Sequence, residues 1–248
     1  MTEKIVKVTE LADLQAILAQ NSGEGGVFLV NKPLTWTSFA VVNKLRHRLV
    51  RVFNNKKLKV GHAGTLDPLA TGLLIVCFGK MTKQIDSFMG LSKAYTGTIR
   101  LGETTPSYDA ETDVNAHFAT DHITPSVLEA TRQSFLGDID QLPPIFSAIK
   151  KDGKPLYESA RKGEEVEIKS RRVTIHQFDI QRVTEKDIDF YVHCSKGTYI
   201  RSLAYDFGKA CDSGGYLTKL CRTRIGDFSL ENAWELSDLV SALEGVKL

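Results

Sequence analysis

Residues 61–78 read GHAGTLDPLATGLLIVCF. Three glycines among the first twelve residues permit tight turns and a close approach of the backbone to a ligand. The last six residues, 73–78, are all apolar and are typical of a strand buried in a sheet. The stretch therefore predicts a constrained loop leading into a buried strand, with Asp67 as the only acidic side chain of the loop.

Asp67 is the first candidate for chemistry. Pro68 restricts Asp67 to an extended conformation, and a single carboxylate in an apolar local sequence suits a nucleophile or base better than a metal ligand. The alternative is an Asp-Pro turn whose carboxylate only accepts hydrogen bonds from nearby backbone N–H groups. His62 is equally open, because a lone histidine can be structural or functional.

Outward from this loop, the pattern alternates between strands and helices. We expect strands at 27–30, 93–101 and 217–224, and strand-like structure from 165 to 194, where apolar residues alternate in the way of a half-buried strand. The alternating residues are Ile188, Phe190, Val192 and Cys194. Strands in series, joined by short turns and interrupted by helices, predict an α+β fold with a largely antiparallel sheet.

The expected helices each have a start or stop signal. Thr37 or Ser38 is expected to cap one whose apolar stripe is Phe39, Val42, Leu45, Leu49 and Phe53. Thr198 is expected to cap another that buries Ile200, Leu203, Ala204 and Phe207. The remaining helices are expected at 11–18, between Thr124 and Gly137, from Lys154 to Lys162, and at 234–243.

Composition bounds the class of protein. The 248 residues are 42% hydrophobic and 25% charged, as in ordinary soluble globular chains. No apolar run approaches the ~20 residues of a membrane helix, and the N-terminus has no apolar segment of the signal-peptide type. Four widely spaced cysteines without a CxxC pair argue against a disulfide scaffold or zinc ribbon. We therefore expect a cytoplasmic protein with no membrane association.

Positive charge is concentrated in two segments although the net charge is only +2. The segment from Lys44 to Lys59 carries seven basic residues and no acid, and residues 196–224 carry six bases and two acids. A run of this kind can be a solvated helix face or a binding surface for phosphates. Two runs flanking glycine-rich segments favour a polyanion.

The second basic segment contains HCSKGTYIRSLAYDFG, residues 193–208. Arg201 lies in the first turn of the expected helix, where a cation is unfavourable without a partner carboxylate. Pairing with Asp67 would keep that carboxylate ionised, as nucleophilic work requires. The alternative is a surface arginine whose aliphatic stem covers apolar surface.

The spacing of the candidate motifs argues against several classes of cofactor and metal site. FGKMT (78–82) is similar to the end of a P-loop, but the Gly72–Gly79 interval is too long, and Met81 stands where a Ser or Thr would hold magnesium. The zinc deaminase pattern is absent after His62. Cys194, beside His193, falls on the apolar phase of its strand and is expected in the core. We expect no cofactor and no metal.

Several motifs together resemble the TruB family of tRNA pseudouridine synthases, which modify uridine 55 in the TΨC loop. They occur in order from Val27 to Phe228: LVNKPLTWTS, the GHAGTLDPLATGLL loop, AYTGTIRLG, LPPIFSAIKKDGKPLYESARKG and CSKGTYIRSLAYDFG. The resemblance implies the pseudouridine synthase fold, a mixed, mainly antiparallel sheet with flanking helices and an RNA cleft. It also implies tRNA as the partner.

The resemblance assigns roles residue by residue. Asp67 matches the catalytic aspartate, Tyr95 the tyrosine that stacks on the target base, and Arg201 the arginine paired with the aspartate. Among substrate-binding positions, His62 matches the histidine inserted into the T loop, Tyr199 and Leu220 line the nucleotide pocket, and Lys32 with Pro33 supports the catalytic loop. Asp109 aligns with an acidic position near the active site, but its surroundings, TTPSYDAET, depart from the usual form and leave its role open.

The domain organisation is expected to be simple. We expect a peripheral segment at 1–24, the catalytic domain at 25–228, and a C-terminal helix within 229–248 without a separate RNA-binding domain. In such a short form, the basic stretch from Lys44 to Lys59 would partly compensate for the missing domain. A monomer without an obligate protein partner is expected. The competing functions are a catalytically silent tRNA-binding or folding module and, less favoured, a nucleotide-dependent RNA enzyme.

Overall fold

The computed structural model describes residues 7–8, 14–15, 25–146, 150–151, 154–155 and 169–246. Contacts divide the chain into two compact units, each described separately below. The first comprises Met1–Ala94 with Cys221–Leu248, and the second comprises Tyr95–Leu220. Two strands, β5 (Lys93–Leu101) and β13 (Gly215–Ile225), contribute residues to both units.

Strands β2 (Gly26–Lys32) and β4 (Ala70–Phe78) form the centre of the first unit. They pair antiparallel, with Lys32 opposite Gly72 at one end and Gly26 opposite Phe78 at the other. The short strand β3 (Val60–His62) pairs antiparallel with β4. On the other edge of β2, β1 (Lys7–Val8) and β15 (Trp234–Glu235) pair parallel with it.

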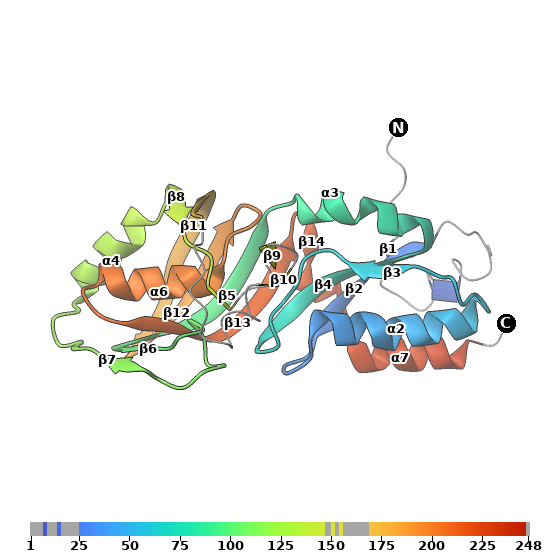
Figure 1. Ribbon diagram of the computed structural model, residues 1–248, viewed down its shortest axis with the longest axis horizontal. Helices are drawn as coiled ribbons and strands as arrows, with labels where there is room; N and C mark the ends of the chain where they lie inside the picture. The colour runs from blue at the N-terminus through green and yellow to red at the C-terminus, as the bar shows by residue number, and fades with distance from the viewer. Residues whose placement is uncertain are drawn as a thin grey trace. The chain divides into compact units, whose positions relative to one another are not determined.

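Both faces of β2 and β4 are covered, which explains why residues 73–78 are continuously apolar. One face packs against helices α2 (Ser38–Val52) and α7 (Leu236–Gly245), which lie side by side (Figure 1). The other face packs against Phe88 of α3 (Ile85–Met89) and Phe228 of β14 (Phe228–Ser229). Two further short helices described in this unit are the 3-10 segments η1 (Gly79–Gln84) and η2 (Leu230–Asn232).

Helix α2 begins as its capping signal predicts, because the Thr37 hydroxyl accepts a hydrogen bond from the Ala40 N–H at 3.0 Å. The predicted apolar stripe was wrong at its first position: Phe39 is 67% exposed, whereas Val41 is fully buried. The buried face runs through Val41, Leu45, Leu49 and Val52, the spacing of one helix face. The expected helix at 11–18 lies almost wholly outside the described residues.

In the second unit the strand order is β13, β5, β12 (Asp187–Cys194), β11 (Arg171–Thr184) and β8 (Gly137–Gln141). β11 pairs antiparallel with both β12 and β8. The alternating residues of β12, from Ile188 to Cys194, are buried as predicted. A separate two-stranded sheet is formed by β6 (Glu103–Thr104) and β7 (Ala116–His117).

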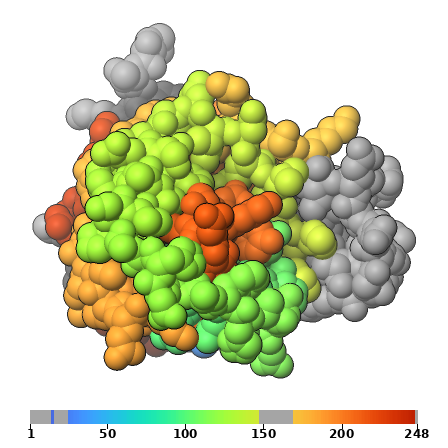
Figure 2. Space-filling view, turned by 90° about the vertical axis from the view of Figure 1, so that its left-hand side faces the viewer, coloured from blue at the N-terminus to red at the C-terminus, as the bar shows by residue number. Residues whose placement is uncertain are grey.

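Helices α4 (Pro125–Ser134) and α6 (Ile200–Ala210) lie beside each other in this unit (Figure 1). Thr124 caps α4 as predicted, with its hydroxyl accepting from the Val127 N–H at 3.3 Å. Phe178 of β11 and Phe207 of α6 pack edge to face at 5.5 Å between ring centroids and join helix to sheet. Figure 2 shows residues shortly after 200 at the centre of one face, surrounded by the chain around 100–140.

Two local predictions in this unit were wrong. Tyr199, not Thr198, is the N-cap of α6, because the Thr198 hydroxyl donates to the Ser195 carbonyl at 3.0 Å. Lys154–Pro155 forms strand β10, which pairs with β9 (Lys150–Lys151), and is not the start of a helix. The rest of that expected helix lies outside the described residues. None of the helices described is long and apolar enough to cross a membrane.

Candidate active site

In the first unit, the loop that contains Asp67 is tied to β4 by one backbone hydrogen bond at its start and closed by another at its end. The Ala63 N–H donates to the Ile75 carbonyl at 2.9 Å, and the Ala70 N–H donates to the Asp67 carbonyl at 3.1 Å. Gly64 bends the chain with φ of +101°, a conformation that strongly favours glycine. Asp67 is half-buried on this loop, so its backbone is held in place while part of the residue stays accessible.

Ser38, the first residue of α2, fixes the residue before Asp67. Its hydroxyl donates to the Leu66 carbonyl at 3.1 Å and accepts from the Leu66 N–H at 2.8 Å. Ser38 and Leu66 are both buried, so water does not replace these bonds. The loop is therefore anchored to α2 on one side and to the sheet on the other. Ser38 was expected, as the alternative to Thr37, only as a candidate cap of α2 and not as a site residue.

Lys32 ends β2 beneath the loop and is fully buried. Its ammonium donates to the backbone carbonyls of Pro33 at 2.9 Å, Trp36 at 2.6 Å and Pro68 at 3.4 Å. Burial lowers the Lys32 pKa to about 8, the nearby Asp67 carboxylate opposes this shift, and Arg222 adds to it. Lys32 thus connects the chain after β2 to the residue that follows Asp67.

Arg222 of β13 is the buried cation that the sequence did not predict as part of this site. It is 2% exposed, and it donates through Nε to the Leu73 carbonyl at 2.8 Å and through Nη2 to the Gly64 carbonyl at 3.0 Å. A Cβ at Gly72 would lie 2.4 Å from the Arg222 carbonyl oxygen, so only glycine fits there. The sequence contained one signal for Arg222. It lies two positions after Leu220 in the expected strand, and residues two positions apart in a strand face the same side of the sheet.

His62 ends β3 and is half-buried. Burial and the positive charge of Arg222 lower its pKa, and the Gly64 backbone acts in the opposite direction. Its buried Nδ1 has no hydrogen-bond partner among the described residues. An unsatisfied buried nitrogen is uncommon, and His62 stays a candidate for a functional role.

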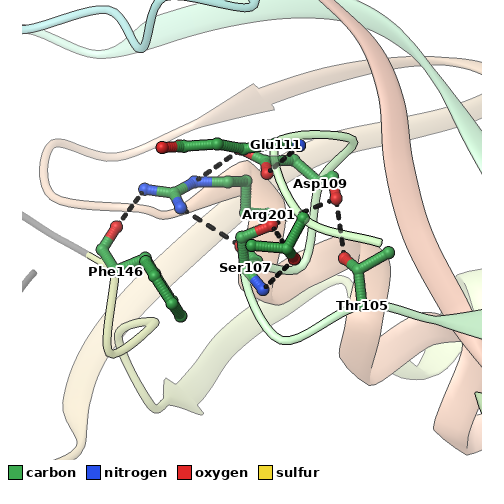
Figure 3. Close-up of polar contacts among 7 residues, drawn as sticks. Thr105, Ser107, Asp109, Glu111, Phe146 and Arg201 are labelled. Atoms are coloured by element: carbon green, nitrogen blue, oxygen red, sulfur yellow. Dashed lines mark hydrogen bonds and ion pairs between the residues drawn. The ribbon is translucent and has the colours of Figure 1, made fainter. Parts of the chain in front are cut away.

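Arg201 lies in the first turn of α6 in the second unit, and Figure 3 shows its contacts. Its guanidinium donates to the carbonyls of Ser107 at 3.1 Å and Phe146 at 2.8 Å, and its Nε lies 3.6 Å from Asp109 Oδ2. The side chains of Arg201 and Asp109 are 5% and 7% exposed. The alternative of a snorkelling surface arginine was therefore wrong.

Asp109 is held as firmly as the arginine it contacts (Figure 3). Its Oδ1 accepts the Glu111 N–H at 3.0 Å, and its carbonyl accepts the hydroxyls of Thr105 at 2.6 Å and Ser107 at 3.1 Å. It also forms an isolated parallel bridge with Leu217 of β13. Asp109 thus has a definite place beside Arg201, which its sequence surroundings left open.

The other expected residues of the second unit lie on three elements. Tyr199, the N-cap of α6, exchanges backbone hydrogen bonds of 2.7 and 3.0 Å with the buried side-chain amide of Gln141, and Arg171 lies 5.2 Å from its ring centroid. Tyr95 is 9% exposed on β5, and Leu220 is half-buried on β13. Within the described ranges, no group of three or more metal-ligating side chains is found.

The family model and the relatives found by comparison with known sequences agree on one family. The model described as TruB family pseudouridylate synthase (N-terminal domain) matches residues 50–200, more than half of the chain. A protein of Flavobacterium johnsoniae named tRNA pseudouridine synthase B is 57% identical over 222 residues, covering 89% of this chain and 97% of that protein. A protein of the same name from Phocaeicola vulgatus is 52% identical over 212 residues, covering 86% of this chain and 90% of that protein.

Solved structures give the same fold. A chain in the crystal structure of a Cbf5–Nop10–Gar1 complex matches with a TM-score of 0.68 and 27% identity. The match covers 90% of the present chain but only 56% of that chain. A chain in an H/ACA RNP bound to a substrate RNA containing 2′-deoxyuridine matches with a TM-score of 0.66, 24% identity, and coverage of 93% and 58%. The expected α+β fold of the pseudouridine synthases is thereby confirmed.

Proposed function

The chain belongs to the TruB family of pseudouridylate synthases, and from this premise we propose that it converts uridine 55 in the TΨC loop of tRNA to pseudouridine. The observation that carries the proposal is the high identity to proteins named tRNA pseudouridine synthase B over nearly their whole length. The rigid loop around Asp67 supports it, because a silent binding module does not require a fixed, half-buried carboxylate.

In the proposed reaction Asp67 acts at the ribose as nucleophile or nucleophilic assistant. The N1–C1′ bond breaks, the uracil turns, and a C5–C1′ bond forms while the proton on C5 is lost and N1 regains a proton. No atom is gained or lost overall, so the reaction is an isomerisation. The anchors at Ser38 and Lys32 hold the backbone on both sides of Asp67, and a loop fixed in this way lowers the entropic part of the barrier.

The target base must leave the RNA stack before Asp67 can reach its sugar. Extrusion requires a few kcal/mol, and we assign Tyr95 to stack on the extruded base and His62 to occupy the space it leaves. Stacking on aromatic rings stabilises splayed bases by about 1–3 kcal/mol. The lowered pKa of His62 keeps its ring neutral at pH 7, which suits insertion among bases.

Arg201 is assigned to hold the catalytic carboxylate in its ionised form, and Asp109 to position Arg201. Asp109 lies at 3.6 Å from Arg201 Nε in a buried setting, and the two carbonyl acceptors restrict the remaining freedom of the guanidinium. We assign Tyr199 and Leu220 to the walls of the nucleotide pocket, with Tyr199 fixed by Gln141.

Binding of the tRNA is assigned in part to the basic stretch from Lys44 to Lys59. Six of its seven cations are exposed: Lys44, Arg46, Arg51, Lys56, Lys57 and Lys59. Arg48 is instead half-buried and forms an ion pair with Glu244 of α7. The exposed cations are therefore available to phosphates, whereas Arg48 helps to hold the C-terminal helix.

The proposal is tested by mapping pseudouridine in total tRNA from cells with and without this protein. We expect a single site, position 55, to lose its modification in many tRNAs when the protein is absent. Unchanged modification at that position, with tRNA binding by the purified protein intact, would instead favour the catalytically silent tRNA-binding module.

A further inference from the structure

A second basic feature lies in the first unit, at the end of β3 and β4 opposite to the catalytic loop. It is a pocket of about 370 Å³ with four lysines in its wall. Lys57 and Lys59 come from the segment between α2 and β3, and Lys80 and Lys83 come from η1. The wall also contains Phe53, Phe78 and Thr82, and none of the described residues that line it is acidic.

The two walls of this pocket are joined rigidly. The Gly79 N–H donates to the Lys59 carbonyl at 3.0 Å, and β3 pairs with β4 at Val60 and Phe78. The Thr82 hydroxyl donates to the Gly79 carbonyl at 2.8 Å and fixes the first turn of η1. The pocket is thus part of the fold and not a gap between loose side chains.

The lysine-bearing segment before β3 is also ordered by its own hydrogen bonds. The Lys57 N–H donates to Asn55 Oδ1 at 3.0 Å, and the Asn55 N–H donates to the Val50 carbonyl at 3.1 Å. The rings of Phe53 and Phe78 lie 5.9 Å apart between centroids, with Phe78 fully buried in the core and Phe53 half-buried. The feature of the pocket that suits a ligand is its rim of four lysines, and a cationic rim attracts a phosphate group.

Among the described residues, no acidic side chain pairs with the charges of this pocket. None of the four lysines forms an ion pair in the part of the chain that the structure describes. From Lys44 to Ile85 the sequence contains one acidic residue, Asp67. Four like charges around one pocket repel each other, and an anion relieves that repulsion.

We propose that this pocket binds a nucleotide of the RNA substrate through its backbone phosphate, at a position away from the target uridine. The inference rests on the proposed function and adds a second RNA contact to it. Two observations favour a polymer over a free nucleotide. The first is that the cations continue from the pocket along the exposed face of α2, where Arg46 donates to the Lys56 carbonyl at 3.1 Å. The positive charge therefore forms an extended surface that can contact several phosphates.

The second observation is the position of the pocket along β3. Lys59 precedes His62 by three residues, which corresponds to about 10 Å in a strand. Stacked nucleotides advance by about 3.4 Å along a strand, so one RNA chain covers this distance in about three nucleotides. The pocket and the catalytic loop can therefore contact the same stem-loop.

The test compares tRNA affinity and its salt dependence for wild type and for the double variant Lys80→Gln/Lys83→Gln. Loss of two phosphate contacts should reduce the slope of log K against log salt by about 1.4–1.8 and lower the affinity about tenfold or more at ~0.1 M salt. The single-turnover rate at saturating tRNA should stay within about twofold of wild type. Lys57→Gln/Lys59→Gln, on the other wall, should reduce the salt slope and the affinity by similar amounts.

Lys169→Gln/Lys186→Gln is the matched control, because it makes the same change in net charge at exposed lysines of the second unit that lie outside both basic segments. A slope and affinity in either pocket variant equal to those of this control would overturn the proposal. Tight binding of uridine monophosphate that tRNA does not displace would also overturn it, by assigning the pocket to a free nucleotide. These binding measurements are independent of turnover, so a wild-type protein that makes no pseudouridine would refute the proposed function without deciding this inference.

Discussion

Asp109→Asn is the substitution whose effect the structure predicts most directly. It removes the charge 3.6 Å from Arg201 Nε but keeps an oxygen that accepts the Glu111 N–H. The two side chains are only 5% and 7% exposed, and breaking a buried ion pair destabilises a protein by about 3–5 kcal/mol. Because Arg201 keeps its two carbonyl acceptors, we expect the lower end, about 3 kcal/mol.

Asp138→Asn is a closely matched control. Asp138 Oδ2 also lies 3.6 Å from an arginine Nε, that of Arg172, and its other oxygen accepts one hydrogen bond, from Thr174. The two side chains of this pair are 54% and 66% exposed, and exposed pairs contribute little because water screens them. The Asp109–Arg201 and Asp138–Arg172 pairs thus match in the carboxylate–guanidinium distance and in having one hydrogen bond to the other carboxylate oxygen, and they differ in burial.

The assay is thermal and denaturant unfolding of both variants, followed by single-turnover pseudouridine formation. A loss of 3 kcal/mol corresponds to a fall in Tm of about 6–12 °C for a chain of this size, and Asp138→Asn should change it little. Asp109→Asn should also slow pseudouridine formation at saturating tRNA, because Arg201 loses one of the groups that position it. Equal stability and equal rates in the two variants would refute the argument from burial.

Two further predictions concern the catalytic loop. Ser38→Ala leaves the buried N–H and C=O of Leu66 without the hydroxyl that bonds both of them. We expect a loss of about 2 kcal/mol in unfolding free energy and a single-turnover rate lowered about tenfold or more. The control Ser213→Ala loses one hydrogen bond to the Ala119 carbonyl and should keep the wild-type rate. Lys32 should titrate with a pKa of about 8 by NMR, and because the Asp67 carboxylate raises this pKa, Asp67→Asn should lower it further. The folded-state pKa of Lys32 lies below the unfolded value of 10.5. The unfolding free energy should therefore increase as the pH rises from about 8 to 10.5. An unchanged Lys32 pKa in the variant would contradict the placement of Asp67 beside it.

The sequence predicted best those elements whose pattern is local. β5 has the predicted bounds, Lys93–Leu101, and β12 alternates as predicted, because strand burial follows a period of two. The phase of α2 was predicted less well: Phe39 is large and apolar, yet it faces outward because the helix buries Val41 and Val42. Residue type alone did not determine which side of the first turn meets the sheet.

Features formed by distant residues could not be read from the sequence. Thr198 has the residue type of a cap, but Gln141, 58 positions away from Tyr199, satisfies the Tyr199 N–H and moves the start of α6. Arg222 and Gly64 are separated by 158 positions, and the buried position of Asp109 beside Arg201 depends on a contact across 92 residues of sequence. Candidate residues were named from motifs, but their partners required the fold.

Tritium release from tRNA labelled with 5-tritiated uridine tests the central assignment most directly, because the C5 hydrogen is lost only when the new C5–C1′ bond forms. Wild-type protein should release one tritium for each target uridine. Asp67→Asn should bind the tRNA with wild-type affinity and release none. Release by Asp67→Asn at the wild-type rate, or no release by a wild-type protein that binds tRNA, would contradict the account.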